Sequence, residues 1–336
     1  MRHWSLNQLK KGMLASSIVL MLCAGCGPTE SIVPEEMTSD SAYTPPVAIT
    51  KRPPVSIVDR TRRSVTFESV PQRIISLSPS STELLFAIGA GSTVVGATNH
   101  CNYPADALKV ARVGSGIMEG TSRETILALK PDLVLCKWDT HEPLLELFER
   151  IGIQAVNIGP ETLEELFDEA RLLGQITGHE QGAESLISQM TERRDGLAQR
   201  VASLSPNQQR TVFYEVWDDP LMTAGPKSFI GELLRMGKMK NVFEDTDASY
   251  PCISSEVVVD RNPDVILTPT NHLKQVEFER VATRPGWANI RAITDKRVFI
   301  INGDEVSRCG PRMLNALEQM IDAVYPETTL KERRQP

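Results

Sequence analysis

The chain has 336 residues, a formal net charge of −7 at pH 7 and 41% hydrophobic residues. An acidic chain is a poor partner for nucleic acid, whose phosphates attract basic surfaces. No apolar run reaches the roughly 20 residues of a permanent membrane-spanning helix, so water-soluble domains are expected.

The first 25 residues have the pattern of a secretory signal. One arginine and two lysines precede an apolar run at 13–22, which ends at small residues and a cysteine. The ending L-C-A-G-C resembles the bacterial lipobox, so Cys26 is expected to be the lipidated N-terminus. Cys23 stands where leucine is usual, and cleavage without lipidation is the alternative. Removal of the signal takes the net charge from −7 to −10.

The segment 26–54 is rich in Pro, Ser, Thr and Glu and has no apolar period, which indicates a disordered tether. About 280 residues follow it, more than a single core usually holds, so two lobes are expected. The expected parts are an N-terminal lobe at 55–178, a linking helix at 179–206, a C-terminal lobe at 207–326 and a tail at 327–336.

The N-terminal lobe is predicted to open with a β-hairpin, because V-S-I-V-D and V-T-F-E flank the polar turn D-R-T-R-R. Strands and helices then alternate, which is typical of an α/β fold. Strands are expected at 73–77, 94–97, 133–136 and 154–158. Helices are expected at 81–88, 121–129, 143–151 and 163–176.

Two segments 132 residues apart are alike, E-T-I-L-A-L-K-P-D-L-V-L from Glu124 and E-V-V-V-D-R-N-P-D-V-I-L from Glu256. Each predicts a helix that ends before a proline, because proline disfavours helical conformation in the residue before it. The apolar run that follows suits a strand of a parallel sheet buried on both faces. The second copy lies in a series that begins at Thr211, so the C-terminal lobe is expected to repeat the α/β architecture.

Residues 180–204 place apolar side chains at helical spacing without proline, which predicts one long helix between the lobes. Two such lobes joined by a helix leave a crevice, lined by the loops at the carboxyl ends of the strands. A ligand site is expected there.

Several enzyme signatures are absent. The glycines of I-G-A-G-S-T-V-V-G lack dinucleotide-binding spacing, and T-A-G-P-K-S lacks two glycines of a phosphate-binding loop. Beyond the signal there is no G-x-S-x-G, H-E-x-x-H or C-x-x-C motif. We therefore expect a protein without enzymatic activity and without a cofactor or resident metal.

Long motifs carry a resemblance to a known family. R-I-I-S-L-S-P-S-S-T-E-L-L-F-A-I-G, V-V-G-A-T-N-H-C-N-Y-P and L-A-L-K-P-D-L-V-L resemble the first lobe of the helical-backbone class (class III) of periplasmic binding proteins. T-A-G-P-K-S-F, G-W-A-N-I-R-A-I-T-D-K-R-V-F-I-I and D-E-V-S-R-C-G-P-R extend the resemblance into the second lobe. It covers nearly all of 55–325, and within the class the cobalamin-binding members are the most similar.

The resemblance implies a monomeric protein exported to the cell envelope. It would capture cobalamin or another corrinoid in the crevice and deliver it to an ABC permease and its ATPase. Binding of a ferric siderophore or haem is the nearest alternative, because those binders share the class motifs. A surface metal-binding or redox protein that uses the cysteines is another alternative, and so is a sensory domain without a permease.

Aromatic residues at the predicted strand ends indicate a ligand surface. Trp138 and Trp217 lie where a strand opens into a loop, and Tyr103 and Tyr250 each precede a proline in similar loops. Rigid aromatic surface suits a large, partly apolar macrocycle. Each of these rings could instead fill the core.

The resemblance assigns Tyr103 and Tyr250 to the ligand surface directly, and it places Asp304 and Arg308 at the polar rim of the ligand. The alternative for the last two is a surface ion pair at i, i+4. Ser80 is predicted either to cap a helix or to donate to the ligand.

The resemblance also makes Glu124 and Glu256 the residues that dock on permease arginines. Both also suit helix starts, and Thr121 with Glu124 fits a capping box. Exposed ion pairs are weak, so a contribution to orientation and encounter rate is expected more than to affinity.

Four cysteines follow the lipidation site, Cys101, Cys136, Cys252 and Cys309. An even number in an exported protein predicts disulfides. The favoured pairs are Cys101 with Cys136 and Cys252 with Cys309, because a bridge across the crevice would obstruct its opening. A zinc site of His100, Cys101, Cys136 and His141 is the alternative.

Overall fold

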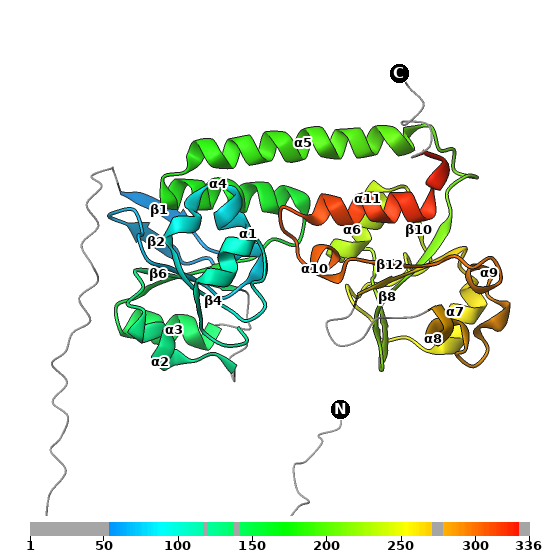
Figure 1. Ribbon diagram of the computed structural model, residues 1–336, viewed down its shortest axis with the longest axis horizontal. Helices are drawn as coiled ribbons and strands as arrows, with labels where there is room; N and C mark the ends of the chain where they lie inside the picture. Colours follow the sequence, from blue (N-terminus) through cyan, green and yellow to red (C-terminus); the bar gives the residue numbers. More distant parts are fainter. Residues whose placement is uncertain (1–53, 117–119, 138–141, 271–277, 329–336) are drawn as a thin grey trace, which may run out of the picture. The chain divides into compact units, whose positions relative to one another are not determined.

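The computed structural model describes residues 54–116, 120–137, 142–270 and 278–328 (Figure 1). The predicted signal peptide, with Cys26, and the tether up to residue 53 lie outside this part. The described chain forms two α/β lobes with largely parallel sheets, which confirms the predicted fold class. Within the same ranges, no helix has both the length and the apolar character needed to cross a membrane.

The N-terminal lobe is built on a sheet in which every neighbouring pair of strands is parallel. In sheet order the strands are β5 (Ala111–Arg112), β4 (Val94–Ala97), β3 (Ile74–Ser76), β6 (Leu133–Lys137) and β7 (Gln154–Ile158). The main helices are α1 (Pro79–Ala87), α2 (Arg123–Ala128), α3 (Glu142–Arg150) and α4 (Leu163–Thr177). The central strands β3 and β6 are buried almost throughout, as their continuous apolar runs predict.

The predicted hairpin is present as β1 (Val55–Val58) and β2 (Ser64–Phe67), which pair antiparallel. Its turn is fixed by Asp59, which is 4% exposed and accepts hydrogen bonds from Thr61, Arg63 and the backbone of Asn157. Burial alone would raise the pKa of Asp59, but these hydrogen bonds hold it below its ordinary value. The bond from Asn157 attaches the hairpin turn to β7.

One long helix, α5 (Glu180–Ala202), links the lobes, as predicted for residues 180–204. It packs on α4 and on α11 (Met313–Val324). Its buried residues are Ala183, Ile187, Met190, Leu197 and Val201. Their helical spacing gives α5 a single apolar face.

The C-terminal lobe repeats the parallel arrangement with one addition. Its strands are β10 (Lys240–Asn241), β8 (Thr211–Asp218), β11 (Val265–Pro269) and β12 (Val298–Ile301), in that order. A further strand, β9 (Leu221–Thr223), pairs antiparallel with β8 and was not predicted from sequence. Besides α11, the α-helices of this lobe in the described residues are α6 (Phe229–Met236), α7 (Ser255–Arg261), α8 (Phe278–Ala282), α9 (Arg291–Thr294) and α10 (Gly303–Val306).

One apolar cluster joins the two lobes. It contains Leu173 of α4, Met190 of α5 and Leu317 of α11. Two other clusters, around Phe148 and Trp287, are each confined to a single lobe. We call the first cluster the shared core.

Successive residues of a central strand serve different cores, because side chains alternate between the faces of a sheet. Leu133 and Leu135 of β6 face the shared core, whereas Val134 faces the core of its own lobe. In β11, Leu267 faces the shared core and Ile266 the core of the C-terminal lobe. The period of two within an all-apolar run therefore decides which core each residue joins.

One predicted helix cap is wrong, and the capping alternative for Ser80 is excluded. Helix α2 is capped by Ser122, whose hydroxyl accepts from the backbone of Thr125, because Thr121 instead forms a bridge with Gly114. Helix α1 begins at Pro79 with Ser78 at the cap position, so Ser80 is not the cap.

Candidate functional site

A cavity of about 240 Å³ lies between the two lobes. The N-terminal lobe contributes the end of β6 and the loop after β7, and the C-terminal lobe contributes the start of α6 and loops near α7 and α10. The lining residues are Lys137, Pro160, Glu161, Lys227, Ser228, Phe229, Ser249, Tyr250, Ser307 and Cys309. The cavity lies where the carboxyl ends of parallel strands predict a crevice.

Tyr250 forms part of the cavity wall on the C-terminal side. Tyr250 is 41% exposed, and Ser228 and Phe229, at the start of α6, line the same cavity. Burial raises the pKa of Tyr250 to about 12, so the hydroxyl stays protonated at neutral pH. A rigid aromatic ring in the cavity wall loses little conformational entropy when it contacts a ligand.

Tyr103 lies in the N-H-C-N-Y-P loop that follows β4. Its side chain is 46% exposed, and the guanidinium carbon of Arg312 lies 4.1 Å from the ring centroid, in a cation–π contact. Arg312 is held in turn by two hydrogen bonds, of 2.9 and 2.6 Å, to the carboxylate of Glu83. Tyr103 is therefore supported on one face and open elsewhere.

Asp304 and Arg308 form the predicted i, i+4 ion pair, at 2.8 Å, but the pair is not on the open surface. Their side chains are 21% and 10% exposed. Arg308 also donates to Glu83 Oε1 (2.9 Å) and to the backbone oxygen of His100 (3.0 Å). Arg308, which belongs to the C-terminal lobe, thus holds the loop of the N-terminal lobe that carries Tyr103.

Glu83 is the centre of this group, which we call the arginine cluster: Glu83, Asn102, Asp304, Arg308 and Arg312. The Glu83 side chain is only 2% exposed and accepts from both arginines. A buried carboxylate is tolerated only where such partners replace water. The arginine cluster therefore connects the two lobes by charge-assisted hydrogen bonds.

Lys137, half-buried in the cavity wall, interacts electrostatically with a buried glutamate, Glu169. Glu169 of α4 is 7% exposed, and its carboxylate accepts from the Ser81 hydroxyl at 3.2 Å. Burial raises the pKa of Glu169 to about 7, although Ser81 and the charge of Lys137 oppose the shift. Burial also lowers the pKa of Lys137. Glu169 is consequently about half protonated near neutral pH.

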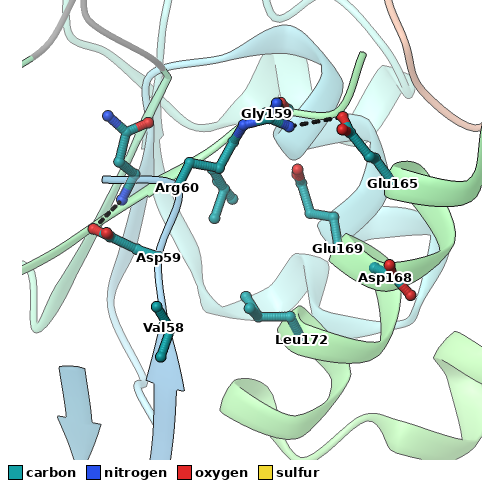
Figure 2. A pocket seen from close by; sticks show the side chains of 10 residues that line it. Val58, Asp59, Arg60, Gly159, Glu165, Asp168, Glu169 and Leu172 are labelled. Carbon is teal, nitrogen blue, oxygen red and sulfur yellow. Dashed lines mark hydrogen bonds and ion pairs between the residues drawn. The ribbon is translucent and has the colours of Figure 1, made fainter. Parts of the chain in front are cut away.

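A second cavity, of about 270 Å³, lies between the hairpin turn and α4 (Figure 2). Figure 2 shows Arg60 joined to Glu165, with Glu169 and Leu172 on the helix that forms the opposite wall. The Arg60–Glu165 distance is 2.8 Å. All of the lining residues belong to the N-terminal lobe, so this cavity is separate from the crevice.

The predicted disulfides are wrong, because the structure has all four cysteines as free thiols. Strand β3 lies between β4, which leads to Cys101, and β6, which carries Cys136. Two strand spacings amount to about 9–10 Å, beyond the roughly 7 Å between Cα atoms that a disulfide can span. Cys252 is exposed on the C-terminal lobe, whereas Cys309 Sγ donates to Thr162 O of the other lobe at 3.4 Å.

The alternative zinc site was predicted from two histidines and two cysteines. Within the described ranges, no three His, Cys, Asp or Glu side chains are grouped as metal ligands, and His141 lies outside those ranges. The hydroxyl of Thr82 donates to Cys101 Sγ at 3.1 Å. Burial raises the pKa of Cys136 to about 12, so this residue stays a thiol.

The other predicted ligand residues lie apart from the cavity wall or outside the described chain. Trp217 is 43% exposed and its indole donates to Asp219 O, but it is not among the described residues that line the cavity. Ser80 is 3% exposed, and its hydroxyl lies 2.9 Å from that of Ser78. Trp138 lies outside the described residues. Roles for these three in ligand binding stay predictions.

Glu124 and Glu256 are both exposed, in the first turns of α2 and α7. A helix that leads into a parallel strand runs against it, so these helix starts lie towards the carboxyl edges of the sheets. Hydrogen bonds from Ser254 and from its own backbone lower the pKa of Glu256, which is therefore ionised at neutral pH. Permease docking by the two glutamates stays a prediction.

Sequence reasoning missed Glu83, Arg312, Lys137 and Lys227. A signal for the first was available, because S-S-T-E-L-L-F places one carboxylate in an otherwise uncharged helix, where it needs a buried cation. The partner could not be identified, since Arg312 is 229 residues away along the chain.

Comparisons with known proteins agree with this architecture. Residues 74–305 match the model of a family described as periplasmic binding protein. An uncharacterized ABC transporter substrate-binding lipoprotein of Bacillus subtilis, YvrC, is 30% identical over 280 residues, which cover 82% of this chain and 87% of YvrC.

Solved structures are also similar. The periplasmic vitamin B12 binding protein BtuF of Vibrio cholerae is 27% identical, with a TM-score of 0.65 over 77% of this chain and 98% of BtuF. A possible iron-binding, periplasmic solute-binding protein of Staphylococcus epidermidis is 29% identical, with a TM-score of 0.68 over 76% of this chain and 99% of that protein.

Proposed function

The chain belongs to the periplasmic binding protein family, and from this premise we propose that it is the substrate-binding protein of an ABC importer. It captures cobalamin or another corrinoid in the crevice and delivers it to a permease driven by an ATPase. The observation that carries the proposal is the pair of half-exposed tyrosines, Tyr250 in the cavity wall and Tyr103 on the loop after β4.

The size of the cavity supports a ligand that is only partly enclosed. Pockets that bury a drug-sized ligand measure roughly 300–1,000 Å³, and this cavity measures about 240 Å³. A corrinoid macrocycle would lie across the mouth, with its ring against the tyrosines and one edge in the cavity. The name of the similar BtuF structure, a vitamin B12 binding protein, supports this choice of ligand.

A ferric siderophore or haem is the second candidate. Lys137 and Lys227 line the cavity from opposite lobes, and ammonium groups suit carboxylate ligands. Lys227 pairs with Asp247 at 3.2 Å, but both side chains are exposed, so this pair is weak and a ligand could replace it. The name of the similar Staphylococcus epidermidis protein refers to iron.

Calorimetric titration of the purified protein with cyanocobalamin tests the proposal. Binding at micromolar concentrations or tighter is expected, and Tyr250→Ala or Tyr103→Ala should each weaken it about 10-fold, as for loss of an aromatic contact. Ile300→Ala is the control, because Ile300 is 41% exposed and is not among the described lining residues. Binding of haemin but not cyanocobalamin would transfer the proposal to the second candidate.

We also propose that Glu124 and Glu256 dock on the permease. Both are exposed at equivalent places of the sequence repeat, so a double Ala variant should retain ligand affinity and lose uptake in whole cells. Glu192→Ala, an exposed glutamate of α5, is the control. Uptake equal to that of the wild type would exclude the docking role.

Lipid anchoring through Cys26 is part of the proposal, supported by the lipoprotein name of YvrC. Mass spectrometry of the mature N-terminus should find an acylated cysteine. An unmodified N-terminus would show cleavage without lipidation.

A further inference from the structure

The side chain of Asn102 occupies a binding position made by Asp304 and Arg308. Its amide nitrogen donates to Asp304 Oδ2 at 2.8 Å, and its amide oxygen accepts from Arg308 Nη1, also at 2.8 Å. Both ends of one primary carboxamide are thus matched by a charged partner. Asn102 is on the N-terminal lobe and its two partners are on the other lobe.

The two partners are held in place independently of Asn102. Arg308 Nη2 donates to Asp304 Oδ1 at 2.8 Å, and Arg308 Nη1 also donates to the buried Glu83. The pair therefore presents an acceptor beside a donor with fixed spacing. A primary carboxamide fits this order, whereas a carboxylate would place its second oxygen against the carboxylate of Asp304.

The occupant is easier to move than its partners. Asn102 is exposed on the loop after β4, whereas the side chains of Asp304 and Arg308 are 21% and 10% exposed. Rotation about the two side-chain bonds of Asn102 would withdraw its amide without moving the backbone. Tyr103, the next residue, is one of the tyrosines of the proposed ligand surface.

We infer that Asn102 is an internal substitute for a primary carboxamide of the ligand. In the ligand-bound protein, a peripheral carboxamide of the macrocycle replaces the Asn102 amide between Asp304 and Arg308. This inference rests on the proposed function and narrows it. The crevice selects macrocycles whose rim carries primary amides and discriminates against those whose rim carries carboxylates.

The exchange has a consequence for affinity. The ligand amide gains two charge-assisted hydrogen bonds, but the Asn102 amide loses two of the same kind. A variant without the Asn102 amide has no internal competitor and should bind the amide ligand more tightly.

Calorimetric titration with cyanocobalamin, which carries primary amides around its ring, tests the inference. Asn102→Ala should tighten binding by roughly 5-fold, the net scale of one ordinary hydrogen bond. Asn102→Ser, which also lacks the carboxamide, should do the same. Asn99→Ala is the control from the same exposed loop and should stay within about 2-fold of the wild type.

A second arm uses cyanocobalamin derivatives in which one rim amide is hydrolysed to a carboxylic acid. At least one of them should bind the wild type roughly 10-fold more weakly, because its carboxylate meets Asp304.

The outcomes separate this inference from the function on which it rests. A wild type that binds no corrinoid overturns the proposed function. A wild type that binds cyanocobalamin overturns the inference if the two Asn102 variants bind equally well or more weakly. Equal affinity for every hydrolysed derivative overturns the selection for amides.

Discussion

The lobes meet in two regions of opposite character. In the shared core, α4, α5 and α11 exclude water with residues such as Leu173, Met190 and Leu317. In the arginine cluster, the contact is made by charges, with Glu83 between Arg308 and Arg312. Apolar packing is non-directional, whereas these hydrogen bonds are directional. The shared core therefore holds the lobes together, and the arginine cluster fixes the position of the loop that carries Tyr103.

The largest effect is expected in the shared core. Leu317 is 1% exposed, so Leu317→Ala should lower the free energy of unfolding by about 3–5 kcal/mol through lost burial and a residual cavity. Leu317→Met keeps the volume and should cost less than about 1.5 kcal/mol. Urea unfolding followed by circular dichroism measures both. Separate transitions for the lobes in the wild type would contradict a core that joins them.

Glu169 is connected with both regions. It lies on α4, which contributes to the shared core, and its carboxylate accepts from Ser81 of α1, the helix that carries Glu83. The pKa of this group is raised from 4.5 to about 7 in the folded chain. Between pH 4.5 and 7 the unfolded chain has released this proton while the folded chain keeps it, so the stability contributed below pH 4.5 is lost by pH 7. The loss is on the order of 3 kcal/mol.

Glu169→Gln removes this titration. The difference in unfolding free energy between variant and wild type should grow in favour of the variant from pH 4.5 to 7 and then level off. Ser81, Lys137 and Arg60 face the carboxyl and stay in place in the variant. A difference that does not change with pH would show that Glu169 titrates normally.

A substitution in the arginine cluster is expected to lower the free energy of unfolding less than Leu317→Ala does, but also to weaken ligand binding. Glu83→Gln leaves Arg308 and Arg312 without their buried carboxylate and should cost about 2 kcal/mol. It should also weaken cyanocobalamin binding, because the support of Tyr103 is lost. Leu317→Ala should leave binding unchanged wherever the variant is folded.

Glu318 is the matched control for Glu83. It also pairs with two arginines, at 2.6 Å to Arg193 and 3.6 Å to Arg200, but its side chain is 43% exposed. Glu318→Gln should cost less than about 1 kcal/mol and leave binding unchanged. Equal effects of the two substitutions would show that burial of Glu83 has no special role.

The architecture could be predicted because it repeats in the sequence. The helix, proline and apolar strand that begin at Glu124 recur at Glu256, and both copies are present as α2 with β6 and α7 with β11. These are local patterns, which depend on residues a few positions apart. Of these elements, β6 and β11 contribute Leu133, Leu135 and Leu267 to the shared core, together with α4, α5 and α11.

The disulfide error concerns a pairing between distant residues. A bridge between Cys101 and Cys136 was predicted because the local sequence does not show that β3 lies between β6 and β4, the strand that leads to Cys101. The protein partners of Arg308 could not be predicted either, because nothing near it in sequence indicates Glu83 or His100.

The unpaired cysteines differ in chemical accessibility. Cys101, Cys136 and Cys309 are buried, and burial raises the pKa of the last two, whereas Cys252 is exposed. Among these four thiols, a maleimide dye would therefore react first with Cys252. Cys252 lies two residues after Tyr250, so the wild-type chain already has an attachment point for an optical reporter beside the crevice.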